Sequence, residues 1–298
     1  MKSKLALFSA IMTLCLLSAL FTSCGGFSDT EYAVISQDNV SSDGYIYDLY
    51  ENDTVRITGI EKAPAIMNIP SVLDGKKVVA IADGAFANNT DILSLTFPSD
   101  SITVGRQAFT GCTSLVSVDL SNSITALPEN VFEDCVNLVI VNGTDKLVSI
   151  EDYAFGGCGS LAVISFPETL ERIGDEVFRG CASLSKVYLG SSLSEIGRSA
   201  FWGCENLVEV TLNCKASIPE YAFLECASLT KVTIGDEVPE IGNEAFRNCR
   251  LLYSIRIGSS VSKIADYAFH ACDTLTEIDF AGSRDSVTIG SGNEALGS

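Results

Sequence analysis

The sequence predicts an α/β repeat protein: a right-handed solenoid whose units of about 23 residues each contribute one parallel strand and one short helical or 3₁₀ turn. Three observations carry this prediction. A phenylalanine recurs at a nearly constant interval, a cysteine follows it three residues later, and an alternating apolar segment follows the cysteine. A unit this short cannot bury its apolar face alone, whereas stacked copies cover one another and share one continuous core.

The phenylalanines mark the repeat. Every interval is 23 residues except the one of 22 between Phe201 and Phe223. The full series is Phe86, Phe109, Phe132, Phe155, Phe178, Phe201, Phe223, Phe246 and Phe269. Parallel strands from these nine units would stack about 4.8 Å apart and form a rod roughly 40–45 Å long.

One copy, 193–212, shows the remaining elements of the unit. Its segment from Val210 to Leu212 alternates as a half-buried strand does. The segment around Ala200-Phe201 and Cys204 is too short for a full α-helix, so we expect a helical or 3₁₀ turn there. Two copies depart from the pattern. Gly143 replaces the third strand apolar of one copy, and the interval from Cys204 to Cys226 lacks one residue near Cys214.

Residues 1–23 read as a secretory signal peptide. Two lysines precede an uncharged apolar run that ends in small residues, and the run is too short and wrongly flanked for a membrane span. The ending "LFTSCGG" is similar to a bacterial lipobox, with Phe21 where leucine is usual, so Cys24 is the predicted lipid-attachment residue. Two acyl chains are roughly what stable anchoring requires. The alternative is an ordinary signal peptide cleaved nearby.

The mature chain divides into three parts. Residues 24–43 are rich in Gly, Ser, Asp and Asn, which is typical of a flexible tether. Residues 44–68 contain two alternating segments around the turn "ENDT" and predict a β-hairpin that caps the first repeat. Residues 69–298 form the predicted solenoid. Its last segment, "VTIGSGNEALGS", begins another unit and stops, either as a poor cap or because the chain continues further.

Charge and hydropathy exclude several classes of protein. The chain is 47% hydrophobic, too apolar for general disorder. Removal of residues 1–23 takes away two lysines and no acid, which leaves 17 basic and 38 acidic side chains and a net charge of −21. A surface this acidic opposes nucleic-acid binding, which depends on basic side chains. We therefore expect no nucleic-acid partner, and contact with a membrane only through the lipid.

The pattern I-x-x-x-A-F-x-x-C-x-S-L-x-x-V-x-L resembles the BspA-like leucine-rich repeats of bacterial surface lipoproteins. It stands here as "IGRSAFWGCENLVEVTL" (196–212) and "IGDEVFRGCASLSKVYL" (173–189), and it covers about 80–298. The resemblance implies a solenoid of leucine-rich-repeat type. It also implies binding at the cell surface, to host matrix proteins or to other bacteria. It does not transfer a particular ligand, because repeat proteins reuse one scaffold for many partners.

Eight cysteines recur with the repeat, and four roles are open to them. Zinc ligands must converge around one ion, whereas equivalent residues of a solenoid lie in a line. A nucleophile needs a base, and the chain has one histidine. Disulfides between neighbouring turns would make the spacing of the stack unequal. We therefore interpret the series as a structural ladder of buried thiols that act as small hydrophobes and weak donors to backbone carbonyls. It comprises Cys112, Cys135, Cys158, Cys181, Cys204, Cys226, Cys249 and Cys272.

No catalytic site, metal or cofactor is predicted. His270, the only histidine, occupies a position that varies in every other copy, so we expect it on the surface. Paired carboxylates could hydrolyse glycosides without a histidine, but no pattern groups the acids around a cleft. No phosphate-binding loop, dinucleotide fingerprint or calcium loop occurs. Cys214, outside the ladder, is expected to be more exposed than its members.

Two surfaces are candidates for binding. On the sheet face, apolar side chains flanked by basic ones are expected to point outward: Ile140, Val163, Lys186, Tyr188, Lys231 and Arg256. The alternative is that these residues merely suit strands. On the turn edge, the candidates are Arg179, Trp202, Leu224 and Arg247, since Trp and Arg are enriched at binding hot spots. These four could equally lean onto the neighbouring turn.

Two functions follow from these patterns. The first is a lipid-anchored, adhesin-like binding module at the bacterial cell surface, which binds a protein or glycan partner as a monomer. The second is a structural or scaffold lipoprotein of the envelope that binds another protein of the same cell.

Overall fold

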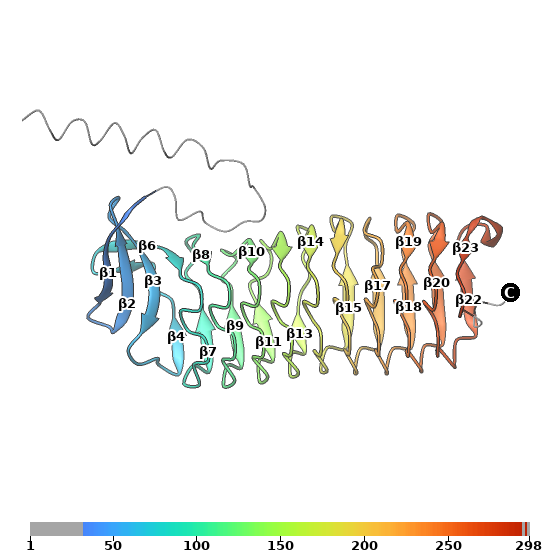
Figure 1. Ribbon diagram of the computed structural model, residues 1–298, viewed down its shortest axis with the longest axis horizontal. Helices are drawn as coiled ribbons and strands as arrows, with labels where there is room; N and C mark the ends of the chain where they lie inside the picture. Colours follow the sequence, from blue (N-terminus) through green and yellow to red (C-terminus); the bar gives the residue numbers. More distant parts are fainter. Residues whose placement is uncertain (1–31, 294–295, 297–298) are drawn as a thin grey trace, which may run out of the picture.

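The computed structural model describes residues 32–293 and 296. The predicted signal peptide, 1–23, and Cys24 lie outside the described residues. The chain forms a long β-solenoid, and a small sheet covers its N-terminal end (Figure 1).

Most repeats cross the molecule twice as a short strand, which corrects the expectation of one strand per repeat; in the shortened copy the second crossing is a single bridge, Ile218 to Ile241. The first crossing builds the sheet face, in two separate sheets. One contains β4 (Ile66–Asn68), β7 (Ser94–Thr96), β9 (Ser117–Asp119), β11 (Ile140–Asn142) and β13 (Val163–Ile164). The other contains β15 (Lys186–Leu189), β17 (Glu209–Leu212), β18 (Lys231–Ile234), β20 (Ser254–Ile257) and β22 (Glu277–Phe280). All neighbours are parallel and in register.

The second crossing builds the back face from strands of two residues. One sheet contains β10 (Ala126–Leu127), β12 (Ser149–Ile150), β14 (Arg172–Ile173) and β16 (Glu195–Ile196). A second contains β19 (Glu240–Ile241), β21 (Lys263–Ile264) and β23 (Thr288–Ile289). The alternation that predicts the sheet face is absent from two-residue strands, and for that reason the sequence did not reveal them.

The predicted helical or 3₁₀ turn around each phenylalanine is wrong. Two positions in every copy, two residues before and two residues after the phenylalanine, have positive φ between 53° and 74°. A left-handed residue cannot continue a right-handed helix. The segment instead forms successive turns whose N–H groups donate to the next copy, as in Phe109 N–H to Val131 O at 3.0 Å. The only helix bounded within the described residues is η1 (Arg284–Ser286).

The N-terminal sheet is larger than the predicted hairpin. Strands β2 (Tyr45–Tyr50) and β3 (Thr54–Ile60) are antiparallel, and β1 (Val34–Val40) adds a third strand where the sequence predicted a tether. Pairing with β2 orders this segment despite its polar composition. β3 then pairs in parallel with β6 (Lys76–Ile81), which pairs with β8 (Thr103–Val104), while β5 (Val72–Leu73) lies antiparallel to β6. Since β4 already pairs with β7, the solenoid starts before residue 69.

The core is one column of stacked rings. The phenylalanines from Phe86 to Phe269 lie nearly parallel, with centroids of successive rings 5.1–5.6 Å apart. All are buried, together with the leucine, isoleucine and valine positions of both faces. At the C-terminal end, the buried side chain of Asn293 accepts a hydrogen bond from the Phe269 N–H at 2.9 Å. In earlier copies the equivalent N–H donates to a backbone carbonyl of the next turn, as Phe246 N–H does to Ala268 O.

Candidate binding surfaces

An uncharged apolar strip runs along the N-terminal half of the sheet face. Its side chains are exposed or half-buried: Leu93, Val116, Val139, Ile140, Ala162 and Val163. Leu93, Val116, Val139 and Val163 are 48%, 43%, 39% and 50% exposed, and they lie together on successive turns rather than singly. The strand segments 112–118, 135–142 and 158–166 contain no Asp, Glu, Lys or Arg. On so acidic a protein, such a surface is a candidate interface.

The backbone fixes the positions of these side chains. Val116 N–H donates to Leu93 O at 2.8 Å, Val139 N–H to Val116 O at 2.8 Å, and Ala162 N–H to Val139 O at 3.0 Å. Ile140 and Val163 are register partners on β11 and β13. The strip is therefore a regular, preformed surface with one or two apolar groups per turn.

Sequence reasoning found only part of this strip. It identified Ile140 and Val163 but missed Leu93, Val116 and Val139, because only the two outward columns within the strands were considered. The position directly after the buried leucine or isoleucine, in "DILSL", "TSLVSV" and "VNLVIV", carries the missing signal. A third outward column, just before each strand, would have revealed it.

The basic residues predicted to flank the strip are not free. Lys186 and Lys231 both contact the Glu209 carboxylate, at 3.4 and 3.6 Å. Arg256 donates to Ile234 O and to Asp236, both at 2.9 Å. The backbone N–H of Ser259, together with the Arg256 guanidinium, lowers the pKa of Asp236. The structure therefore neutralises the charges that the sequence placed around an apolar centre.

Tyr188 lies apart from Ile140 and Val163. It projects from β15 and is 51% exposed, but β15 belongs to the second sheet and does not pair with β13. Its hydroxyl accepts a hydrogen bond from Asn213 Nδ2 at 3.4 Å. The predicted six-residue patch is thus divided between two sheets, and only its first two members join the apolar strip.

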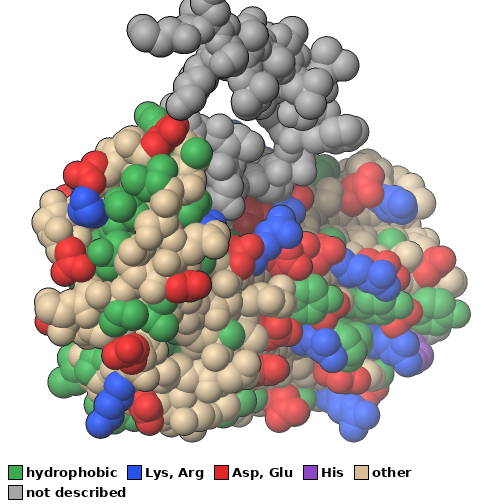
Figure 2. Space-filling view, turned by 60° about the vertical axis from the view of Figure 1, so that its left-hand side comes forward, with side chains coloured by type: hydrophobic (Ala, Val, Ile, Leu, Met, Phe, Trp, Pro, Cys, Tyr) green, Lys and Arg blue, Asp and Glu red, His purple; other side chains and the backbone are tan. Residues whose placement is uncertain are grey.

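The turn-edge residues contact one another across successive turns. The Arg179 guanidinium lies over the Trp202 ring, 4.7 Å from its centroid, and donates to Glu176 at 3.0 Å. Trp202 Nε1 donates to Glu225 at 3.2 Å, Arg247 donates to Glu244 at 2.6 Å, and Leu224 is half-buried. Arg179 and Trp202 therefore lean onto neighbouring turns, as one of the two interpretations expected, whereas Arg247 pairs with an acid of its own turn. Acidic and basic side chains alternate in rows along the solenoid in Figure 2.

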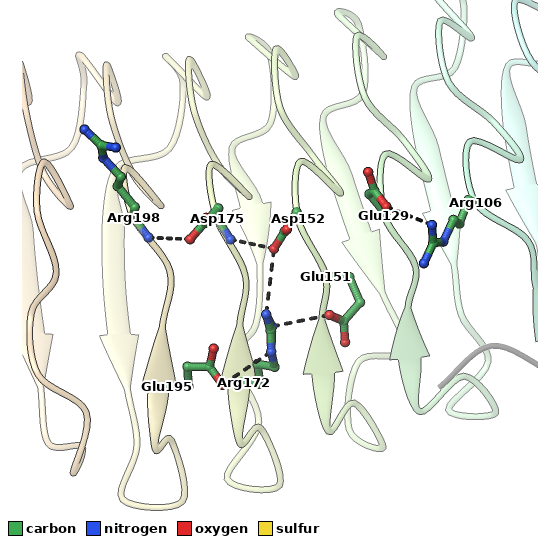
Figure 3. A network of polar contacts seen from close by, with 8 residues as sticks. All are labelled: Arg106, Glu129, Glu151, Asp152, Arg172, Asp175, Glu195 and Arg198. Carbon is green, nitrogen blue, oxygen red and sulfur yellow. Dashed lines mark hydrogen bonds and ion pairs between the residues drawn. The ribbon is translucent and has the colours of Figure 1, made fainter. Parts of the chain in front are cut away.

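A second polar network ties the turns together behind the sheet face (Figure 3). Arg172 contacts Glu151 at 3.3 Å, Asp152 at 3.8 Å and Glu195 at 3.4 Å, and so joins three successive turns. Asp152 and Asp175 each accept a backbone N–H from the next turn, that of Asp175 at 2.8 Å and that of Arg198 at 2.7 Å. Arg106 pairs with Glu129 at 3.3 Å. This surface holds the stack together through charges that satisfy one another.

The eight ladder cysteines are buried, free thiols. Each Sγ lies 3.1–3.3 Å from the carbonyl oxygen of the phenylalanine of the preceding turn and donates to it. Burial raises the pKa of Cys272 to about 12 and raises the pKa values of Cys181, Cys204, Cys226 and Cys249 well above the ordinary value. These five thiols stay protonated at neutral pH.

The expectation that Cys214 is more exposed than the ladder cysteines is wrong. Cys214 is fully buried, and its Sγ lies 3.9 Å from Ala216 O. The turn that holds it is one residue shorter than its counterparts, and both Cys214 and Ala216 face inward there. His270 is exposed, with its ring edge-on to Tyr267 at 5.7 Å.

The described residues contain no group of three or more His, Cys, Asp or Glu side chains placed to hold a metal ion. In the same part of the chain, no helix has the length and hydrophobicity of a membrane span.

Comparison with known proteins places these features in a family. The model of the BspA-type leucine-rich repeat region matches residues 79–208 and 216–292, in six copies. Comparison with curated proteins gave no match.

Several bacterial structures are similar. The pneumococcal vaccine antigen PcpA is 17% identical, with a TM-score of 0.54 over 83% of this chain and 70% of that one, which supports the fold alone. A leucine-rich repeat protein of T. pallidum is 27% identical over 79% of this chain and 89% of its own, with a TM-score of 0.46. A leucine-rich cell surface protein of Faecalibacterium prausnitzii is 22% identical over 89% and 97%, with a TM-score of 0.40. Because the family model matches most of its length, the chain belongs to the BspA-type leucine-rich repeat family.

Proposed function

We propose that this protein is a lipid-anchored binding module of the bacterial cell surface that recognises a protein partner through the apolar strip. The exposure of Leu93, Val116, Val139 and Val163 in one row, with no charged residue in segments 112–118, 135–142 and 158–166, is the observation that carries the proposal. Aliphatic side chains at fixed spacing fit an apolar protein surface, whereas sugars are usually stacked on aromatic rings, which the strip lacks. Solenoids of this family generally serve as binding scaffolds rather than enzymes.

The location is part of the proposal. The apolar run before Cys24 favours export and lipid attachment. Structural neighbours include a bacterial cell surface protein and a vaccine antigen, which agrees with display outside the cell. The polar segment after Cys24 would separate the lipid from β1, and the strip would then lie along one side of the rod, open to the surroundings of the cell.

The test compares two double variants of the full chain displayed on cells. Val116→Asp with Val139→Asp places two charges in the strip. Thr230→Asp with Thr276→Asp places the same charges in the same column of the second half, where both threonines are exposed. Cells are incubated with an array of extracellular matrix proteins and bacterial surface proteins. Binding that is lost in the first variant and retained in the second supports the proposal, while equal losses contradict it.

Location has its own test. Protease added to intact cells should remove the repeats of the wild-type chain, and a Cys24→Ala variant should fail to incorporate a labelled fatty acid. A chain that resists protease on intact cells contradicts surface display and favours a scaffold role inside the envelope.

A further inference from the structure

The sheet face is interrupted at one step of the solenoid. β13 ends one sheet and β15 begins the next, and among the described residues no strand pairing joins them. Bonds resume on either side of the gap: Ser183 N–H donates to Gly159 O at 3.0 Å and Ser194 N–H to Glu171 O at 2.9 Å. The missing ladder is therefore confined to segments 162–166 and 185–189.

The other two sides of the same step are closed. On the back face, β14 pairs with β16 through Arg172–Glu195 and Ile173–Ile196. On the turn edge, Phe178 N–H donates to Ala200 O and Gly180 N–H to Trp202 O, each at 2.7 Å. Arg172, through its contacts with Glu151, Asp152 and Glu195, adds an ionic clamp across the back (Figure 3). At this step the sheet face therefore lacks strand pairing, whereas the back face and the turn edge are hydrogen-bonded.

Two neighbouring copies before the gap depart from the pattern at their third apolar position. Gly143, with φ +71°, leaves no side chain there in the copy that contains β11. In the next copy that position is Phe166, whose ring packs edge-on against both Phe178 at 5.5 Å and Phe201 at 6.4 Å, the next two rings of the column. The Phe166 ring therefore reaches across the open step. In the first copy, Phe97 packs edge-on against the next ring of the column, Phe109, at 5.9 Å.

The residues on the two sides of the gap also differ in how deeply they are buried. Ile164 and Phe166 are only partly buried, whereas Val187 and Leu189, their counterparts one turn later, are 2% and 1% exposed. A large ring that occupies the space between two turns acts as a wedge, because close-packed neighbours cannot approach past it.

We infer that the solenoid is jointed at this step: two rigid rods, each with its own sheet, are hinged along the back face and the turn edge and open at the sheet face. Hinges of this kind place the motion in a few residues between packed bodies. Opening separates Ala162 and Val163, at one end of the apolar strip, from Tyr188 on the second rod. The joint does not depend on the proposed partner.

Hydrogen–deuterium exchange of the full chain tests the joint. Exchange is followed by mass spectrometry in peptides that cover 185–189 and 208–212, the same positions one turn apart. Successive N–H groups of a strand point to opposite neighbours. Alternate N–H groups of 208–212 therefore point to β15, where Val208 N–H also donates to Ser185 O at 2.9 Å, whereas the corresponding groups of 185–189 face the gap and the others point to β17. We expect the gap-facing amides of 185–189 to exchange at least about tenfold faster than their counterparts in 208–212, because unpaired strand amides open locally. Equal rates in the two segments overturn the inference.

A matched pair of variants tests the wedge. Phe166→Leu installs the residue found at Leu189, and we expect it to slow exchange in 185–189 toward the rate of 208–212. Phe97→Leu makes the same change in an unbroken sheet and should leave both rates unchanged. Faster exchange in 185–189 in Phe166→Leu, with 208–212 unaffected, contradicts the wedge. The wild-type comparison stands even where a variant fails to fold.

Discussion

The two halves of the sheet face share one buried pattern and differ in strand length and in many outward residues, although Val208 and Tyr253, 41% and 49% exposed, continue the column of Val116 and Val139 into the second half. In the first sheet of this face (β4, β7, β9, β11 and β13) the strands are two or three residues long, and the face carries the apolar strip. In the second sheet (β15, β17, β18, β20 and β22) every strand has four residues, and Glu209 contacts both Lys186 and Lys231. The third apolar position of the second half is regular, filled by buried Leu189, Leu212, Ile234 and Ile257, whereas the first half has Phe97, Leu120, Gly143 and Phe166 there. The repeat thus dictates the core, while the outward residues are free to specialise.

The largest expected effect tests whether both halves share the same core. Phe132→Ala and Phe223→Ala each remove one ring from the stack, where both are fully buried. Each should lower the free energy of unfolding by about 3–5 kcal/mol, because a cavity remains in a close-packed column. Urea unfolding followed by circular dichroism measures the loss. Values that differ between the halves by more than about 2 kcal/mol, beyond the usual context dependence of such cavities, would show that the cores are not equivalent.

The second effect is a loss of stability at alkaline pH. Burial raises the pKa values of most ladder thiols in the folded chain, among them Cys158, Cys226 and Cys272, that of Cys272 to about 12, against an ordinary value of 9.0. Their contribution is fully present below pH 9 and is lost as pH rises, because the unfolded chain releases protons that the folded chain retains. Above pH 9, each thiol should remove about 1.4 kcal/mol of unfolding free energy per pH unit.

Single-thiol variants isolate this effect from the titration of other groups. Cys158→Ala in one half and Cys226→Ala in the other are compared with the wild type under reducing conditions. Each should make the fall of the unfolding free energy between pH 9 and 10.5 less steep, by about 1.4 kcal/mol per pH unit. Slopes identical to that of the wild type would show that the thiols do not govern the alkaline loss.

A smaller effect concerns the turn edge. Arg179→Ala removes the guanidinium over Trp202 and should cost about 0.5–1 kcal/mol, the range for cation–π contacts near the surface. The emission of Trp202, the only tryptophan, should shift toward that of an exposed indole. Arg250→Ala, at an exposed arginine in a later turn, serves as the control. An unchanged spectrum in Arg179→Ala would mean that the stacking does not shield the ring.

The smallest effect is expected on the charged half of the sheet face. Glu209→Gln removes the partner of both lysines, yet exposed ion pairs contribute little, so the loss should be about 0.2–0.5 kcal/mol and should vanish in high salt. Thermal unfolding at low and high ionic strength measures it. A loss that persists at high salt would indicate packing rather than charge.

Much of the fold could be predicted from the sequence because the solenoid repeats its buried residues. The spacing of Phe201 and Cys204, recurring from turn to turn, is enough by itself to indicate that the units stack. The back-face strands could not be predicted, since two residues show no alternation. The left-handed positions were missed because Gln107, Glu176 and Glu244 give no sign of positive φ, which the inter-turn hydrogen bonds impose on them.

The site was predicted less well, for a related reason. Outward residues follow no rule of burial, so the sequence predicted Lys186, Lys231 and Arg256 to be available, although Glu209 and Asp236 already bind them. Which acids lie beside which bases depends on the register of consecutive turns. That register was evident in the sequence, and comparing all three outward columns would have exposed both the ion pairs and the strip.

The central claim, that the apolar strip receives the partner, is tested most directly by site-specific crosslinking on cells. A photoreactive amino acid replaces Val116 in one chain and Thr230, in the same column of the second half, in another. We expect the Val116 chain to capture a protein of defined mass and the Thr230 chain to capture none. Capture from Thr230 alone, or equally from both positions, would contradict it.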